Sequence, residues 1–424
     1  MIASVLRHIQ ENLQRDITTI TAEYAIVTPM FIGDASQQAS GITVNSFKGA
    51  LRFWWRALVW GRILETAKEK EVEALCNLNH EEALLFGSSA INPETNKIYG
   101  KGKIAIQILP QAWTKETKGA VHPHLVNYTA ARYLGYGVIE AFDSTPRQVQ
   151  AGQLIRDCLD EDQSFTVQVS GKTSVISEIL PALQALGLLG GLGSKNRKGY
   201  GSLVLEKITE ANGQFTYIPP ESLEEYYQQI ASLVDKPPAD PPPFSAFSEH
   251  ALIRYLVNGS SCYDVLNTYG AAMLRYRSWG RGGVVLGKPS EKKFRKDHAW
   301  AKGEDVFQRV VPCLNYESFH PDRVVFGLPH NYGKPTRQQV GRPVMKGVET
   351  VPGGRRASPL LFHVHRIGNH LHGIACLLQA TFLPDEEKIQ AGNHEVDQKI
   401  RWKILRERFL CDNKRFPGGR NIFP

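Results

Sequence analysis

Residues 46–62 read Ser46-Phe-Lys-Gly-Ala-Leu-Arg-Phe-Trp-Trp-Arg-Ala-Leu-Val-Trp-Gly-Arg62, and this stretch says most about the fold. It contains four cations, five aromatic residues and no carboxylate. In an α-helix, with about 100° between successive residues, Lys48, Arg52 and Arg56 form one stripe. The neighbouring face is apolar and suited to pack on a core. That face consists of Phe47, Leu51, Trp54 and Leu58.

The basic stripe has two interpretations. Cations edged by aromatic residues suit a phosphate backbone whose bases stack on the rings, and Trp55 lies between the two faces. Alternatively, the arginine stems cover apolar surface and bind no ligand. Both interpretations stay open from the helix alone. The candidate RNA-binding residues in it are Lys48, Arg52, Trp55 and Arg56.

Length and composition predict a globular protein of two domains, or three. The chain has 424 residues, 42% of them hydrophobic, and a net charge of +8. An anionic partner is compatible with this charge but is not required by it. The six cysteines are widely spread and form no C-x-x-C pair, so we expect reduced thiols and a cytoplasmic protein. No run of about twenty apolar residues predicts a membrane span.

A proline-rich segment divides the chain. Five prolines fall between Asp235 and Phe244, which excludes a helix or a central strand and favours an extended spacer. We therefore expect an N-terminal domain at 1–234, a linker at 235–246 and a C-terminal domain at 247–424.

The first half predicts the order strand, helix, strand, strand, helix, strand, which is that of a ferredoxin-like domain. The basic helix, capped by Asn45 or Ser46, is the first helix. The second is expected at 177–189, where Pro181 is tolerable only in the first turn. The expected strands are 17–30, 103–109, 164–170 and 202–208.

The second half predicts an α+β domain of similar type, although no internal repeat is visible. Strands are expected at 251–257, 358–367 and 373–382, and helices at 263–279 and 395–410. A basic stretch from Arg275 to Lys296 is expected to contact nucleic acid or a partner subunit, unless it is only a solvated loop.

A glycine-rich loop is the second strong feature. Five glycines between Gly190 and Gly201 allow positive φ angles and a close approach of backbone N–H groups to an anion. The loop follows a helix and precedes a strand, the reverse of a nucleotide-binding phosphate loop, so we reject an ATPase or dehydrogenase and expect no cofactor. Its alternative is a flexible hairpin that is basic for solubility. Its candidate RNA-binding residues are Gly191, Gly193, Ser194, Lys195, Arg197, Lys198 and, for stacking, Tyr200.

Two further motifs lie in the second half. Arg355 and Arg356 open a strand and are candidates to grip a phosphate, or else mark a solvated strand end. Four histidines lie between His363 and His372. They could hold a divalent metal or act in acid–base cleavage of RNA, but no carboxylate in the run completes a site, so we expect no metal and histidines that lie at the surface or face RNA.

Several of these motifs together resemble one family. Residues 27–33 and 47–56 resemble the N-terminal signature of the RAMP-superfamily subunit numbered one in the Cmr module, the type III-B CRISPR effector complex. Residues 85–88, the glycine-rich loop at 187–201, residues 355–360 and Phe382-Leu-Pro384 resemble later motifs of the same family, in the same order. In this resemblance Lys48, Arg52 and Arg56 match basic positions of the first motif. The loop motif is matched by Gly191, Gly193, Gly199 and Gly201, and the C-terminal motif by Arg355 and Arg356.

The resemblance implies two ferredoxin-like, RRM-related domains with antiparallel sheets. It also implies a non-catalytic RNA-binding subunit that contacts the 3′ region of a CRISPR guide RNA, the bound single-stranded target RNA and other Cmr subunits in antiviral defence. One alternative is a metal-independent RAMP-type endoribonuclease that uses His363 or His365 to activate a 2′-hydroxyl. Another is an architectural protein that contacts subunits but little RNA.

Overall fold

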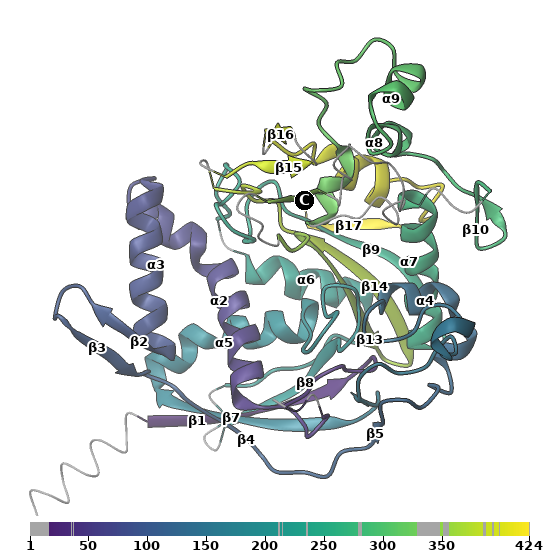
Figure 1. Ribbon diagram of the computed structural model, residues 1–424. Coiled ribbons are helices and arrows are strands. Elements are labelled where there is room, and N and C mark those ends of the chain that lie inside the picture. Colours follow the sequence, from purple (N-terminus) through teal and green to yellow (C-terminus); the bar gives the residue numbers. More distant parts are fainter. Residues whose placement is uncertain are drawn as a thin grey trace, which may run out of the picture.

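The computed structural model describes residues 17–34, 36, 38–210, 213, 215–234, 236–278, 282–328, 348–350, 356–384, 387–391, 394–397 and 399–423. Two four-stranded antiparallel sheets organise these residues (Figure 1). The first sheet is built from the first half of the chain and the second from the second half.

The first sheet has the ferredoxin-like connection predicted from the sequence. Its spatial order is β4-β7-β1-β8, so the first and third strands of the motif are central. Every neighbouring pair is antiparallel. The elements are β1 (Ile17–Ile26), α2 (Val44–Thr66), β4 (Ala105–Ile108), β7 (Ser164–Lys172), α5 (Thr173–Leu189) and β8 (Leu203–Glu210).

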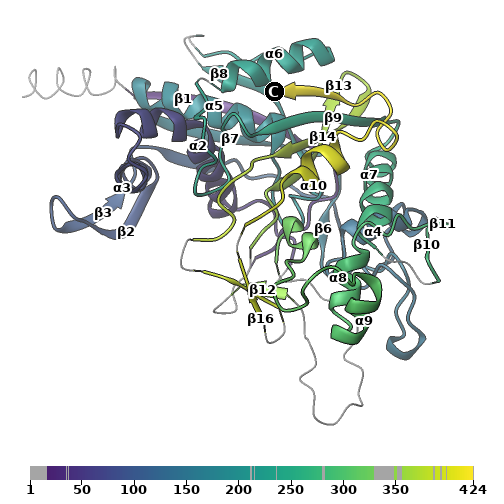
Figure 2. The ribbon, with the colours of Figure 1, turned by 90° about the horizontal axis from the view of Figure 1, so that it is seen from above.

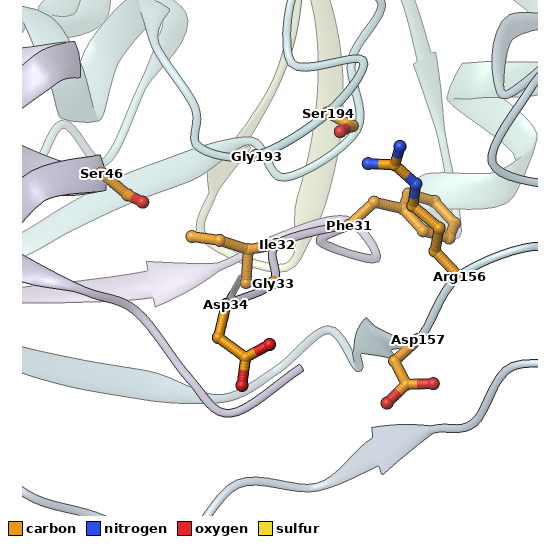
Figure 3. A pocket seen from close by; sticks show the side chains of 9 residues that line it. All are labelled: Phe31, Ile32, Gly33, Asp34, Ser46, Arg156, Asp157, Gly193 and Ser194. Atoms are coloured by element: carbon orange, nitrogen blue, oxygen red, sulfur yellow. The ribbon is translucent and has the colours of Figure 1, made fainter. Parts of the chain in front are cut away.

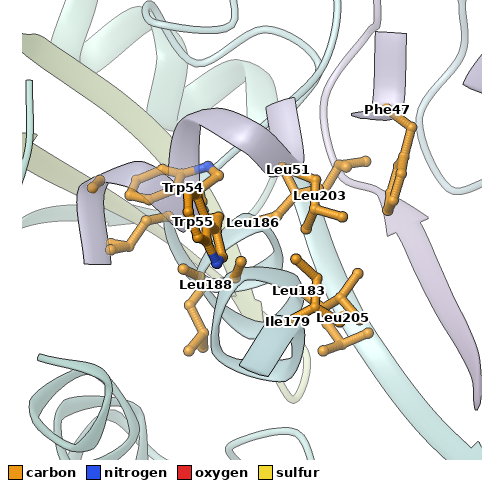
Figure 4. Packing of buried hydrophobic residues seen from close by; sticks show 14 of the residues in the cluster. Phe47, Leu51, Trp54, Trp55, Ile179, Leu183, Leu186, Leu188, Leu203 and Leu205 are labelled. Carbon is orange, nitrogen blue, oxygen red and sulfur yellow. The ribbon is translucent and has the colours of Figure 1, made fainter. Parts of the chain in front are cut away.

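Helix α2 packs its predicted apolar face on α5 and β8. Phe47, Leu51 and Trp54 are buried, and Figure 4 shows Leu51 and Trp54 on the side of the helix near Leu186 and Leu203. The Phe47 ring instead meets the Tyr24 ring of β1, with 5.6 Å between the centroids. Burying one such side chain stabilises the fold by about 2 kcal/mol, so this face fixes the helix on the sheet. The predicted cap was wrong. The helix starts two residues earlier than expected, and the Thr43 hydroxyl accepts a hydrogen bond from the Ser46 N–H at 3.2 Å.

The prediction for α5 was also wrong at its start. The helix begins at Thr173, so Pro181 lies in its interior and not in its first turn. Proline lacks an N–H and removes one helical hydrogen bond, but nine residues of this helix are buried. Tertiary packing on both sides therefore outweighs the local penalty.

The second sheet repeats the order of the first. Its order is β13-β14-β9-β17, which again places the first and third strands of the motif in the centre. Helix α7 makes the first crossover and starts with a capping box between Ser261 and Asp264. The elements are β9 (Leu252–Gly259), α7 (Cys262–Arg277), β13 (Leu360–Ile367), β14 (His370–Leu377), α10 (Lys403–Leu405), a π-helical turn (Arg406–Leu410) and β17 (Arg420–Phe423).

The terminal helix predicted at 395–410 was wrong in its first half. A short strand, β16 (His394–Val396), stands where that helix should start, and helical structure begins only at Lys403. Helix α7 ends at Arg277, and Trp279, the predicted end, lies outside the described residues.

The two sheets share their hydrophobic cores. One core contains Leu51 of α2, Leu183 of α5 and Tyr226 of α6 (Leu223–Leu233) together with Ile253 and Ile374 of the second sheet. Helix α5 contacts both β8 and β13. Helices of the first half therefore cover one face of the second sheet, and neither sheet is buried on that side without the other half of the chain.

The proline-rich segment packs along α2. The Phe244 ring meets the Trp60 ring edge-on, with 5.2 Å between the centroids, and the Phe247 N–H donates to the Ala57 carbonyl at 3.1 Å. A methyl group on Gly61 would lie 2.8 Å from the Lys236 carbonyl oxygen. The domain boundary at 235–246 stays a prediction, and Asp235 lies outside the described residues.

Several smaller elements surround the sheets. Helix α3 (Glu71–Phe86) and the hairpin of β2 (Gly87–Asn92) and β3 (Lys97–Lys101) project on the side opposite α4 and α7 in both views (Figures 1 and 2). None of the helices in the described ranges is long and apolar enough to cross a membrane. The other elements are β5 (Lys115–Glu116), η1 (Leu125–Asn127), α4 (Thr129–Leu134), η2 (Thr145–Arg147), β6 (Cys158–Leu159), β10 (Val284–Val285), β11 (Lys288–Pro289), α8 (Arg295–Trp300), α9 (Glu304–Val310), η3 (Asp322–Phe326), β12 (Val348–Thr350) and β15 (Ile389–Ala391).

Candidate nucleic-acid interface

The predicted basic stripe of α2 is paired with a carboxylate. Arg52 Nε and Arg56 Nη1 both donate to Oε1 of Glu82, at 2.5 and 2.8 Å. Glu82 belongs to α3, and its side chain is only 7% exposed. This buried carboxylate therefore neutralises part of the positive charge of the two guanidinium groups. Lys48 is partly buried, and this burial, with the nearby charge of Arg52, lowers the pKa of its ammonium group.

The two aromatic residues proposed for base stacking are buried. Trp55 is 1% exposed, and its indole N–H donates to Glu178 of α5 at 3.3 Å. Tyr200 is fully buried, and its hydroxyl donates to the Ala131 carbonyl at 2.8 Å. Neither ring can stack on a base while the core stays closed, so the structure corrects both predicted roles.

The glycine-rich loop joins the two sheets. β13 is an edge strand of the second sheet, and the edge that no other strand pairs with lies against the loop. The Phe362 N–H donates to the Arg197 carbonyl at 3.0 Å, and the Val364 N–H donates to the Ser202 hydroxyl at 3.1 Å. The loop thus satisfies backbone groups that an edge strand would otherwise leave unpaired.

The loop glycines are needed for close packing. Gly193, Gly199 and Gly201 have positive φ, and a methyl group on Gly201 would lie 2.1 Å from the Leu192 carbonyl oxygen. Gly191 has a normal φ, but a methyl group there would meet the Gly201 carbonyl at 2.5 Å. The N–H groups of Gly199 and Gly201 donate to backbone carbonyls. These two groups are therefore not available for an anion, contrary to the prediction.

A basic cavity of about 410 Å³ lies where the loop meets the second half of the chain. Its cations come from the loop, from the end of α7 and from the residue pair that precedes β13. None of the described residues that line it is Asp or Glu. The five cations are Lys195, Arg197, Lys198, Arg277 and Arg356. Four of these were predicted RNA-binding residues, and Arg277 came from the basic stretch predicted to contact nucleic acid. Arg355 lies outside the described residues.

The charges in this cavity oppose one another. Burial, followed by the charges of Arg277 and Lys195, lowers the pKa of Lys198 to about 7. Arg197 is held by the Ser358 carbonyl at 2.7 Å, and burial together with Arg356 lowers its pKa. An anion in the cavity would relieve this repulsion, so the site is suited to a phosphate.

A second cavity, of about 250 Å³, lies on the other side of the loop (Figure 3). Gly193 and the predicted Ser194 line it, with Arg156. Two carboxylates, Asp34 and Asp157, line it as well. Asp157 accepts hydrogen bonds from two backbone N–H groups, which lower its pKa and keep it charged. This side of the loop is therefore less favourable for a phosphate than the basic cavity.

A family model for the RAMP superfamily matches residues 23–204. This range runs from within β1 to within β8 and contains α2, α5 and the glycine-rich loop. Residues 23–204 are therefore similar to the RAMP superfamily. The predicted RAMP resemblance and the α+β, ferredoxin-like fold class are thereby confirmed.

Solved structures resemble the chain beyond its RAMP domain. The crystal structure of Cmr1 from Pyrococcus furiosus in its apo form matches with a TM-score of 0.53 and 16% identity, covering 96% of this chain and 98% of Cmr1. At this identity the similarity establishes the fold alone. A chain from the type III-B Cmr-beta complex bound to cognate target RNA has a TM-score of 0.43 and 12% identity, with 85% and 94% of the two chains covered. A comparison with curated protein sequences found no match.

The open face of the RAMP-domain sheet carries no aromatic platform. Cross-strand pairs on this face are polar, such as Thr19 with Ser170 and Thr21 with Gln168. RNA-binding sheets of the RRM type stack bases on aromatic residues of the sheet. Among the paired residues of β1 and β7 on this face, none is aromatic. This face therefore lacks the stacking rings that an RRM sheet uses.

The histidines proposed for RNA cleavage lie inside the protein. His363 and His365 are 1% and 0% exposed. His363 bridges the Gly190 carbonyl, 2.9 Å from its Nδ1, and His365, 3.1 Å from its Nε2. Burial lowers the pKa of His363 to about 3. Both rings therefore join the glycine-rich loop to β13, and neither can reach a 2′-hydroxyl. In the described part of the chain no group of three or more His, Cys, Asp or Glu is placed to hold a metal ion.

Sequence reasoning missed an exposed aromatic residue near the basic cavity. Tyr136 follows α4 and is 66% exposed. The position of a methyl group on the next residue, Gly137, lies 3.9 Å from Lys195 Nζ. An exposed aromatic ring is a surface on which a base can stack, the role that had been expected of Trp55. Its sequence signal was weak, because Tyr136 lies in a segment without a basic motif.

Glu82→Gln tests the ion pairs of α2. The neutral amide leaves two arginines without their shared charge, so we expect a loss of about 2 kcal/mol in the free energy of unfolding. Glu81→Gln is the matched control, because it breaks only the exposed pair with Arg62 and should change stability by less than about 0.5 kcal/mol. Urea denaturation of both variants measures the difference. Equal changes in the free energy of unfolding would contradict the conclusion that Glu82 holds the two arginines through a buried carboxylate.

Gly201→Ala tests the packing of the glycine-rich loop. The methyl group would clash with a backbone oxygen at a positive φ, so we expect the free energy of unfolding to fall by about 3 kcal/mol. In the control Gly49→Ala, a helical position with open space around it, stability should rise by about 0.5 kcal/mol. Thermal unfolding distinguishes the two. A neutral Gly201→Ala would show that the loop is not tightly packed.

Proposed function

We propose that this protein is a non-catalytic RNA-binding subunit of a type III-B CRISPR effector, a Cmr complex of the cytoplasm. Its partners would be the guide RNA, near its 3′ region, the single-stranded target RNA and other Cmr subunits. The observation that carries the proposal is the cavity in which five cations from three segments converge without a lining carboxylate. The RAMP domain at 23–204 and the fold shared with Cmr1 support the assignment to this class of complex.

The mechanism is capture of the RNA backbone. Phosphates of a single strand would lie against the cations of the glycine-rich loop and of α7, while Tyr136 offers a ring on which a base stacks. Contacts to phosphates carry no sequence information, so binding should be strongly salt-dependent and weakly sequence-dependent. The stripe on α2 would contribute less, because Glu82 already neutralises part of it.

The triple variant Lys195→Ala/Lys198→Ala/Arg277→Ala tests this mechanism. Removing three phosphate contacts should reduce the magnitude of the slope of log K against log salt by about 2. The control is Lys97→Ala/Lys101→Ala/Lys103→Ala, which removes the same charge from the β2–β3 hairpin and the residues after it, on the far side of the molecule (Figure 1). Fluorescence anisotropy with labelled single-stranded RNA across a salt series measures both slopes.

Other results of this titration would contradict the proposal. Equal losses in the two variants would mean that net charge, and not the cavity, drives binding. Affinity that holds steady as salt rises would exclude backbone capture, and absent binding would favour an architectural subunit. RNA that is cut in the same tubes without added metal would favour an endoribonuclease.

The pH dependence of RNA binding follows from Lys198. Its pKa is about 7, so it is charged at pH 6 and largely neutral at pH 8.5, and a bound phosphate favours the charged form. Affinity should therefore fall as pH rises through 7, by up to roughly 30-fold at pH 8.5. The groups that face Lys198 or share its cavity are Lys195, Arg197, Arg277, Arg356, Tyr133 and Tyr269.

Lys198→Arg is the control for this pH series. Arginine keeps its charge over the whole range, so the variant should bind RNA with a much flatter profile above pH 7. Anisotropy at constant ionic strength between pH 6 and 8.5 measures both proteins. Parallel profiles would show that another group is responsible.

A further inference from the structure

The lining of the basic cavity is chemically mixed. Beside the five cations, apolar and aromatic side chains form what we call its apolar wall. Its volume of about 410 Å³ lies in the range of sites that enclose a small organic molecule, about 300–1,000 Å³. A surface that only tracks a phosphate backbone needs the cations but no enclosed apolar wall. That wall includes Leu134, Tyr269, Met273, Phe326 and Leu360.

Two rings of the apolar wall make close contacts with other side chains. The Tyr269 ring stacks on Phe362 of β13, with 3.7 Å between the centroids and 3° between the planes. Phe326 is covered by Arg277, whose guanidinium carbon lies 4.6 Å from the ring centroid. Since Phe362 also pairs with the loop at Arg197, the cations and the apolar wall are held by the same contacts.

A nucleotide is chemically complementary to this combination of cations and apolar side chains. Its phosphate requires cations, and its base is planar and largely apolar on its faces. Single-stranded RNA can turn one base out of the strand, whereas a paired strand cannot do so without cost.

We propose that the cavity receives one nucleotide of a bound single-stranded RNA, with the phosphate against Lys198 and Arg277 and the base against Tyr269 and Met273. This inference rests on the proposed function and names the part of the RNA that the site encloses. It predicts that one base of the bound strand is unstacked and lies inside the protein, between the glycine-rich loop and α7.

Photo-crosslinking with 4-thiouridine tests the inference. A single-stranded RNA that contains this base at several positions is bound to the full chain and irradiated, and the crosslinked peptides are identified by mass spectrometry. We expect crosslinks to the α7 segment around Met273. RNA that binds but crosslinks only elsewhere would overturn the inference and leave the proposed function standing. Absence of salt-sensitive RNA binding by the wild type would overturn both.

Met273→Trp is the decisive variant, because it fills the apolar wall and leaves all five cations in place. We expect its salt slope to stay unchanged, its RNA affinity to fall roughly tenfold and its crosslink at α7 to be lost. Met273→Leu keeps the side-chain volume and should behave as the wild type. If Met273→Trp does not fold, as checked by thermal unfolding, Met273→Phe replaces it. A filled cavity that still binds RNA with wild-type affinity would contradict the inference.

Competition with a free nucleotide shows whether the cavity binds a nucleotide of an RNA strand or a free nucleotide. UMP at millimolar concentration should leave the crosslink at α7 largely intact, because the strand gains further phosphate contacts that a free nucleotide lacks. If UMP removes the crosslink while the RNA stays bound, the cavity is a site for a free nucleotide, and the inference about RNA is wrong.

Discussion

The contact between the glycine-rich loop and the edge of β13 is the constraint on which the rest of the structure depends. An edge strand presents unpaired backbone groups, and here Arg197 and Ser202 accept from two of them. His363 reinforces the joint from inside by bridging Gly190 and His365. Because the loop follows α5 and precedes β8, this joint fixes the second sheet directly on the helical layer of the first. Loss of the loop geometry would separate the two halves of the shared core.

The same joint also brings the cations of the glycine-rich loop beside cations of the second half of the chain. Cations on α2 face α3, and the buried carboxylate of Glu82 holds two of them. Cations on the loop instead face α7 and the start of β13, where more cations come from the second half of the chain. Burial and the neighbouring charges of Arg277 and Lys195 together lower the pKa of Lys198, so a charge cluster without a lining carboxylate is unfavourable in isolation. A bound anionic ligand offsets the repulsion among the cations of such a cluster.

The repeated ferredoxin-like order gives the two halves different tasks. The first sheet keeps one polar, open face, whereas β13 and most of β14 are buried on both faces. The second sheet therefore cannot present a binding surface in the manner of an RRM, and the first has no aromatic platform on the paired face of β1 and β7. The candidate binding groups therefore lie in the basic cavity, where the glycine-rich loop, the end of α7 and the residues before β13 converge.

The sequence by itself determined the element order of the RAMP domain, the apolar face of α2 and the basic character of the loop. Each of these follows from periodicity or composition within a short segment. It did not determine that Trp55 and Tyr200 are buried, that Glu82 reaches Arg52 and Arg56, or that Arg277 joins Lys198. Those facts depend on residues between 26 and 123 positions apart, and only the packing of the folded chain brings them together. Local patterns fix the elements, but burial and the pairing of charges depend on what the folded chain places beside them.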